Sequence, residues 1–244
     1  VRLDARPGWW NLPGLWRLAR RLRGFDFVYD LQTSARSSQY FRLAGRPLWS
    51  GIARGASHPH ANPGRDAMHT IERQREQLAM AGIAEIAAPD LGWLAVAGRV
   101  FDLPRPYALL APGAAPHRPA KRWPAAAFAA LAAALAARGL APVVIGTAAE
   151  APLADAIRAT CGAAIDLTGR TTLPDIGRLA AGAACAVGND TGPMHLAAAM
   201  GCRCVVLFSA DSDPALTAPR GAVTVLRCAR LADLPVARVA AALA

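Results

Sequence analysis

Residues 184–208 read ACAVGNDTGPMHLAAAMGCRCVVLF: an apolar stretch, a short polar turn, an alanine-rich segment and a second apolar stretch. The apolar residues 184–187 and 204–208 predict two buried strands, and residues 192–200 between them predict a helix. Strands that are apolar throughout and alternate with helices are typical of a doubly wound parallel sheet. Such sheets bind ligands beyond the carboxyl ends of their strands, so the polar turn is a candidate site.

The same alternation continues on both sides of this unit. Short apolar runs bounded by Gly or Pro predict further strands at residues 107–111, 142–145, 165–167 and 223–226. Longer segments predict helices at residues 124–138, 150–160, 173–182 and 234–243. The carboxyl-terminal part of the chain therefore reads as a nearly complete α/β domain.

The amino-terminal part shows fewer strands. One short buried strand is predicted at residues 25–31 and a second at residues 91–97, while residues 45–66 are rich in Gly and Pro and read as loop. Helices are predicted at residues 15–23, 35–44 and 67–81.

Pro104-Arg105-Pro106 reads as a hinge, because two prolines around one residue stiffen the chain and forbid a helix. We therefore expect two domains, at residues 1–104 and 105–244. A parallel sheet of two strands cannot bury both of its faces, so we expect the first domain to lack its opening strand–helix units.

The composition predicts a folded chain without a membrane span, since 54% of residues are hydrophobic and 18% are charged. The longest apolar stretch, residues 125–137, is too short to cross a bilayer, and residues 1–4 hold no apolar signal region. We expect a cytoplasmic protein. The cysteines lack CxxC spacing and are expected to be buried reduced thiols; they are Cys161, Cys185, Cys202, Cys204 and Cys228.

The net charge of +10 does not indicate a nucleic-acid partner, because no block of basic residues or nucleic-acid-binding signature is present. The densest cluster lies on the predicted helix at residues 15–23 and consists of Arg17, Arg20, Arg21 and Arg23. One interpretation is that these arginines bind anionic lipid headgroups or a phosphorylated substrate. The other is that they form an ordinary solvated helix face.

The sharpest candidate site is VGNDTGPMH at residues 187–195. Gly192 lacks a Cβ, and the free N–H groups of the helix start form an anion site together with the helix dipole. The Thr191 hydroxyl adds a donor, and we expect His195 to face the same mouth. The alternative is an ordinary helix start, with Asp190 or Thr191 as the capping residue and His195 buried.

Two further motifs follow predicted strands. Lys121, Arg122 and Trp123 precede a helix, and a lysine beside an arginine suits phosphate. Lys121 is the only lysine among 27 basic residues, which favours a chemical role over a solvated basic loop. Glu150 follows the strand at residues 142–145, where its carboxylate either accepts hydrogen bonds from ribose or sugar hydroxyls or favours the helix start.

Together these motifs resemble glycosyltransferase family 9, the ADP-heptose:lipopolysaccharide heptosyltransferases. The resemblance covers most of the chain and is strongest in residues 107–219. It is carried by Pro112-Gly113, residues 121–124 with Phe128, Gly146 with Glu150, residues 167–169, 188–195, 208–214 and 217–219, and upstream by residues 29–32 with Arg36-Ser37 and by His69, Glu72 and Arg73.

The resemblance implies a GT-B fold, with two Rossmann-like domains of parallel sheets facing across a cleft and the N-terminal one incomplete here. The C-terminal domain would bind the nucleotide sugar and the N-terminal domain the acceptor. It implies inverting, metal-independent transfer of a heptose-like sugar from an ADP donor to a lipopolysaccharide core or related envelope acceptor, with no cofactor. An anionic glycolipid acceptor adds a peripheral contact with the inner membrane as a further expectation.

The resemblance also implies roles for single residues. Lys121 would stabilise the leaving diphosphate, and Arg36 and Arg73 would contact acceptor phosphate or carboxylate. The implied donor-binding residues are Glu150, Asp190, Thr191, Gly192, Pro193, Met194 and His195. The family's probable catalytic Asp lies in a Gly-rich loop after its first strand, a region absent from this sequence, so the general base is unassigned.

Two alternatives remain open at this point. One is another GT-B enzyme or a nucleotide-sugar epimerase, which donor hydrolysis versus transfer would separate. The other is a non-catalytic nucleotide-sugar-binding fragment. The exact sugar, nucleobase and acceptor do not follow from the residues.

Overall fold

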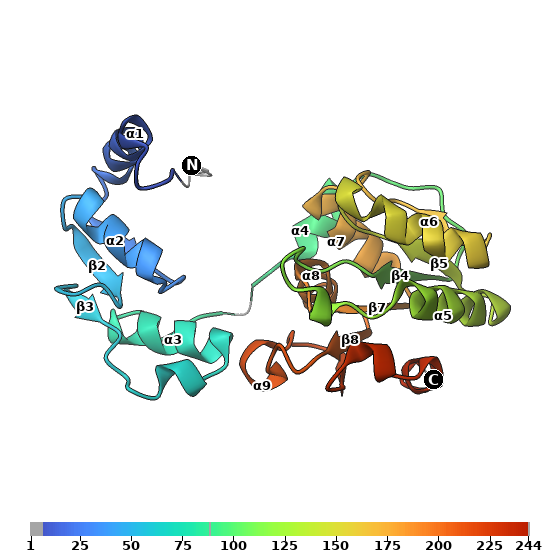
Figure 1. Ribbon diagram of the computed structural model, residues 1–244. Helices are drawn as coiled ribbons and strands as arrows, with labels where there is room; N and C mark the ends of the chain where they lie inside the picture. The colour runs from blue at the N-terminus through green and yellow to red at the C-terminus, as the bar shows by residue number, and fades with distance from the viewer. Residues whose placement is uncertain (1–6, 88, 244) are drawn as a thin grey trace. The chain divides into compact units, whose positions relative to one another are not determined.

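The computed structural model describes residues 7–87 and 89–243, which fold as two compact units, each built on its own parallel sheet (Figure 1). The second unit begins at Pro89, whereas the sequence placed the boundary between residues 104 and 105. Residues 1–4, in which we noted no apolar signal region, lie outside the described residues.

The observed boundary between the units differs from the predicted one because the strand predicted at residues 91–97 is wrong. This segment forms helix α4 (Gly92–Ala97), which packs on helix α7 (Leu173–Gly182) of the second unit. Leu94 is buried against Gly177, where an added Cβ would come within 2.7 Å of the Leu94 Cβ. Short apolar runs fit a strand or a buried helix equally well, and packing on α7 selects the helix here.

A salt bridge also holds residues 89–104 on the second unit. Arg99 Nη2 lies 2.7 Å from Asp175 Oδ2, and the Arg99 backbone N–H donates to Asp175 Oδ1 at 2.7 Å. The hydrogen bonds from the Arg99 side chain, supported by those from Thr172, hold the pKa of Asp175 well below its usual value although burial opposes this. This contact joins the segment before the predicted hinge to the start of α7.

The first unit has three parallel strands in the order β1–β2–β3, namely Phe27–Tyr29, Leu48–Gly51 and His58–Pro59. Its helices are α1 (Leu12–Leu22), α2 (Ala35–Leu43) and α3 (Thr70–Met80), with a 3₁₀ turn at Arg65–Ala67. The loop reading of residues 45–66 missed β2 and β3, because strands of two to four residues depend on pairing rather than on local pattern.

Two details of the first unit differ from expectation. The buried strand expected at residues 25–31 forms only at Phe27–Tyr29, and it is not buried throughout, because Tyr29 is exposed. Phe25, two residues before it, is exposed as well. Helix α3 starts at Thr70 rather than at residue 67, because the His69 side chain accepts a hydrogen bond from Ile71 N and caps the helix there.

The second unit has six parallel strands in the order β6–β5–β4–β7–β8–β9. They are β4 (Tyr107–Ala111), β5 (Ala141–Val144), β6 (Ile165–Asp166), β7 (Cys185–Asn189), β8 (Cys204–Phe208) and β9 (Val223–Arg227). Counted from β4 as the first strand, this is the Rossmann order. The chain adds β5 and β6 on one side of β4 and then β7, β8 and β9 on the other, so the strand order reverses between β4 and β7. The prediction of a doubly wound parallel sheet is confirmed.

Helices cover both faces of this sheet. One face packs against α5 (Ala125–Ala137), α6 (Ala151–Thr160) and α10 (Val236–Ala241), and the other against α7 and α8 (Gly192–Ala199). The remaining short elements are α9 (Pro214–Thr217) and 3₁₀ turns at Pro119–Lys121, Ala148–Glu150 and Leu231–Asp233. Successive residues of β4 such as Leu109 and Leu110 point to opposite cores, so every position of this strand is apolar.

All five cysteines are free thiols, and all but Cys228 are buried, as the sequence predicted for most of them. No helix within residues 7–87 and 89–243 is both long and apolar enough to span a membrane.

Candidate functional site

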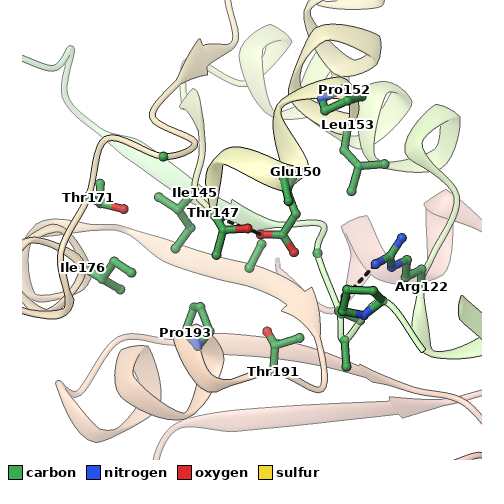
Figure 2. A pocket seen from close by; sticks show the side chains of 18 of the residues that line it. Arg122, Ile145, Thr147, Glu150, Pro152, Leu153, Thr171, Ile176, Thr191 and Pro193 are labelled. Carbon is green, nitrogen blue, oxygen red and sulfur yellow. Dashed lines mark hydrogen bonds between the residues drawn. The ribbon is translucent and has the colours of Figure 1, made fainter. Parts of the chain in front are cut away.

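The candidate site lies at the carboxyl edge of the second unit's sheet, beside the point where the strand order reverses. A cavity of about 790 Å³ opens there, a volume that suits a small-molecule ligand. Figure 2 shows Glu150 reaching into it, with Thr191 and Pro193 at the start of α8 on the opposite side. The three sequence motifs follow β4, β5 and β7 and lie at the same edge of the sheet.

Lys121 and Asp190 form a largely buried ion pair next to the cavity. Lys121 Nζ lies 2.7 Å from Asp190 Oδ2, and the two side chains are only 12% and 8% exposed. The solvated basic loop considered from the sequence is therefore wrong for Lys121. A desolvated ammonium held by one carboxylate keeps two further N–H donors for an anion.

His195 approaches the other oxygen of the same carboxylate. His195 Nε2 lies 3.6 Å from Asp190 Oδ1, and its side chain is 45% exposed rather than buried. Burial acts to raise the pKa of Asp190, but contacts with His195 and Lys121 together with the charge of Lys121 hold that pKa below its usual value. Asp190 is thus a carboxylate at neutral pH and links two cationic or donor groups.

The start of helix α8 is open to a ligand. Thr191 is the N-cap residue, but within the part of the chain that the structure describes its side chain makes no hydrogen bond to the first-turn amides. Its Oγ1 donates instead to the Asn189 carbonyl oxygen at 3.2 Å. Space is also free around Gly192, where an added Cβ would meet no described atom within 4 Å. Pro193 has no N–H, and Met194 N and His195 N donate to Thr191 O at 3.0 and 3.4 Å. The helix start therefore offers an anion the Gly192 N–H and the helix dipole.

Met194 takes a different place from the other residues of its motif. Its side chain is buried in the core below α8, and its Sδ would lie 2.7 Å from a Cβ added at Gly188. The Met194 backbone N–H donates to Thr191 O at 3.0 Å, and Met194 is not one of the described residues that line the cavity.

Glu150 takes the helix-start role that the sequence offered, whereas hydrogen bonding to ribose or sugar hydroxyls stays a prediction. Its Oε2 accepts hydrogen bonds from Thr147 N at 2.7 Å and Thr147 Oγ1 at 3.2 Å, which caps the helix start. The carboxylate also lines the cavity, between Gly113 and Gly146. A Cβ at either glycine would overlap the carboxylate, so both glycines make room for it.

Asn189 is a site residue to which the sequence analysis gave no role. It is fully buried at the end of β7, and its Nδ2 donates to the carbonyl oxygens of Pro112 (2.8 Å) and Gly113 (3.2 Å). Its Oδ1 accepts from Trp123 N at 3.0 Å. An amide at the end of an otherwise apolar strand was the available signal, because buried amides need partners.

The residues expected to contact the acceptor, Arg36 and Arg73, lie on two helices of the first unit. The Arg36 guanidinium stands 5.2 Å from the centre of the Trp9 ring and donates to Pro7 O at 3.3 Å. Arg73 Nη1 lies 3.9 Å from Asp66 Oδ1. Both are in reach of solvent, and each has a weak present partner.

Among the described residues, no three His, Cys, Asp or Glu side chains lie close enough to hold a metal ion. Among the described residues, the positive groups at the site include the Lys121 ammonium, the start of α8 and the Arg122 guanidinium, which lines the cavity and donates to Ala114 O at 2.7 Å.

Comparison with known proteins identifies the family. The model of glycosyltransferase family 9 (heptosyltransferase) matches residues 15–235. Lipooligosaccharide heptosyltransferase 2 of Haemophilus influenzae is 35% identical over 120 residues, which are 47% of this chain and 34% of that protein. The chain thus aligns with about a third of the length of this curated relative.

Solved structures extend the likeness over nearly the whole chain. The E. coli ADP-heptose LPS heptosyltransferase II is 26% identical with a TM-score of 0.73, over 94% of this chain and 79% of that one. The E. coli heptosyltransferase WaaC with ADP shares the fold at 23% identity and a TM-score of 0.74, over 95% and 78%. Because the family model spans both units, the chain belongs to glycosyltransferase family 9, the heptosyltransferase family.

Proposed function

We propose that this protein transfers a heptose-like sugar from an ADP donor to a lipopolysaccharide core or related envelope acceptor. The observation that carries the proposal is the cavity between Glu150 and Thr191, with the buried pair of Lys121 and Asp190 beside it. Relatives support the substrate class: one is named a lipooligosaccharide heptosyltransferase, and the E. coli enzyme of the same fold has been solved with ADP and with ADP-2-deoxy-2-fluoro heptose.

In this proposal the nucleoside occupies the cavity. Its walls include apolar side chains such as Ile145, Leu153 and Ile176, which suit a nucleobase. The Glu150 carboxylate accepts hydrogen bonds from ribose hydroxyls. The diphosphate then extends towards Thr191 and the start of α8.

The chemistry is a single displacement. An acceptor hydroxyl attacks the anomeric carbon, the bond from that carbon to the diphosphate oxygen breaks, and a general base takes the hydroxyl proton. The departing ADP gains negative charge, which the Lys121 ammonium, the Gly192 N–H and the dipole of α8 stabilise without a metal. One displacement inverts the anomeric centre. Asp190 holds Lys121 and, with His195, orients the donor sugar.

The acceptor is anionic in this proposal and binds the first unit. Arg36 and Arg73 are the candidate contacts, because guanidinium groups bind phosphate and carboxylate in a two-pronged geometry. Their present partners, the Trp9 ring and Asp66, hold them weakly enough to be exchanged for a stronger anion.

Helix α1 supplies a surface for the membrane that carries such an acceptor. Trp10 just before it is 87% exposed and Trp16 is 60% exposed, although large aromatic side chains are usually covered. Exposed arginines accompany them, including Arg17 and Arg20, and the Arg20 guanidinium lies 4.9 Å from the centre of the Trp16 ring. Tryptophan beside arginine is the composition of helices that lie on anionic bilayers.

Vesicle binding tests the membrane surface. The protein should sediment with phosphatidylglycerol vesicles at low salt and stay in solution with phosphatidylcholine alone. The double change Trp10→Ser and Trp16→Ser should abolish sedimentation, whereas Trp93→Ser, an exposed tryptophan of α4, should leave it intact. Equal binding by both variants would show a solvated helix face instead.

A transfer assay tests the function. The protein is mixed with ADP-heptose and a heptose-accepting core glycolipid in EDTA, and products are identified by mass spectrometry and the anomeric proton coupling. We expect ADP release together with a glycolipid one heptose heavier, of inverted configuration. ADP release with free heptose would indicate hydrolysis, and an altered nucleotide sugar would indicate an epimerase.

A further inference from the structure

Asn189 connects three separate segments of the second unit through one buried side chain. Both amide hydrogens donate to the loop after β4, at the carbonyl oxygens of Pro112 and Gly113. The amide oxygen accepts the backbone N–H of Trp123, just before α5. With its two donors and its acceptor engaged, the amide is well satisfied in a site closed to water.

The sheet itself does not need these bonds. Gly188 already pairs with Ala111 on β4, and Asn189 pairs with Leu207 on β8 through the backbone ladder. The side-chain amide reaches beyond the ladder to loops that diverge from the sheet edge. Its effect therefore falls on the loops of the site rather than on strand pairing.

Both ends of the ion pair at the site are joined to this amide. Asp190 follows Asn189 directly in the chain, and Lys121 stands two residues before Trp123. The Trp123 ring is buried and its Nε1 donates to Leu234 O at 3.0 Å, so this end is anchored on the protein core. Trp123 N bound to Asn189 Oδ1 then fixes where the Lys121 side chain starts relative to Asp190.

We propose that Asn189 is a positioning residue: its amide sets the distance between Lys121 and Asp190 and so places the only ammonium side chain of the protein beside the donor diphosphate. The role at the diphosphate rests on the proposed function, whereas the alignment of the ion pair does not. The hydrogen bonds of the Asn189 amide go to the backbone of Pro112, Gly113 and Trp123, so Asn189 acts on the ion pair through the backbone of Trp123 and Asp190.

The single lysine makes the alignment directly measurable. In protein labelled with ¹⁵N-lysine, Lys121 is the only source of a side-chain Nζ signal. A buried, paired ammonium exchanges its protons slowly with water and gives an observable resonance, whereas a solvated one does not. Asn189→Leu keeps the side-chain size and removes all three hydrogen bonds, and Asn189→Ala provides a second variant. Tyr107→Phe is the matched control, because it removes a buried hydrogen bond to Leu179 O from the amino end of the same sheet.

We expect the Nζ signal in the wild type and in Tyr107→Phe and its loss in both Asn189 variants, as in Asp190→Asn. In calorimetry, Asn189→Leu should weaken ADP binding about tenfold, as for the loss of one charge-assisted contact, and leave AMP binding within about twofold. A second change, Lys121→Ala, should weaken ADP binding little further in the Asn189→Leu background.

Each failure has a separate signature. A wild-type Nζ signal in folded Asn189→Leu and Asn189→Ala would overturn the inference whatever happens to ADP. Unfolding of both variants where Tyr107→Phe stays folded would also overturn it, by showing a purely structural role. A wild type that shows the Nζ signal but binds no ADP would defeat the proposed function and leave the alignment standing.

Discussion

Lys121 Nζ and Asp190 Oδ2 lie 2.7 Å apart, although 69 residues separate them in the chain and both side chains are nearly buried. A buried ion pair contributes little to stability, because desolvation offsets most of the attraction. We therefore propose that the pair, which lies beside the start of α8, serves to bind an anion.

Replacing Lys121 by Ala should therefore weaken ADP binding by about tenfold or more, since one charge-assisted contact to phosphate is lost. Calorimetry with the purified variant measures this. Arg118→Ala is the control, because Arg118 is an exposed cation of the same loop and should leave the affinity unchanged. Equal affinity in the two variants would remove Lys121 from the diphosphate site.

Gly113→Ala should displace the Glu150 carboxylate, because the new Cβ would occupy its position. We expect its loss of ADP affinity to equal that of Glu150→Ala, and the double variant to be no weaker than either single one. Gly162→Ala is the control, since its Cβ would enter open space. Additive losses in the double variant would show that Gly113 acts by another route.

Trp123→Ala should lower the free energy of unfolding by about 4 kcal/mol, as expected for a fully buried large aromatic side chain. Trp123→Phe should cost less, because the edge-to-face contact with Phe128 can persist while Leu234 O loses its donor. Urea denaturation followed by circular dichroism measures both. A change below about 1 kcal/mol for the alanine variant would contradict the buried placement.

The stabilisation from Asp175 should disappear in acid. The pKa of Asp175 is lower in the folded chain than in the unfolded chain, where it is about 3.9. The charged carboxylate therefore contributes its full stabilisation above that pH, and this contribution is lost as the pH falls through the folded-state pKa. Asp175→Asn should therefore be less stable than wild type at pH 7 and approach it between about pH 4 and 2. Thermal unfolding across this range measures the difference. A gap that stays constant with pH would show that the charge of Asp175 is not responsible.

The sequence predicted the second unit well, because strands such as β4 and β8 are apolar at every position. Its parallel pairing follows from that pattern, because only a sheet covered on both faces buries runs such as residues 204–208. The first unit was harder to predict. Strands β2 and β3 are too short for a periodic signal, and residues 91–97 became a helix by packing on α7.

At the site, too, local contacts could be predicted from the sequence and long-range contacts could not. Helix capping by Glu150 follows from its spacing to Thr147, which is a local matter. The core position of Met194 and the three bonds of Asn189 could not be foreseen, since each depends on residues more than five positions away in the chain.

The sequence by itself determined the apolar strands, the turn residues at their carboxyl ends and the types of chemical group placed there, because these depend on neighbours within a few residues. Tertiary structure alone decided that Lys121 meets Asp190, that Glu150 lies between two glycines and that Asn189 joins the loops around them. These contacts arise where β4, β5 and β7 are brought together, and packing free energy rather than local propensity sets that order.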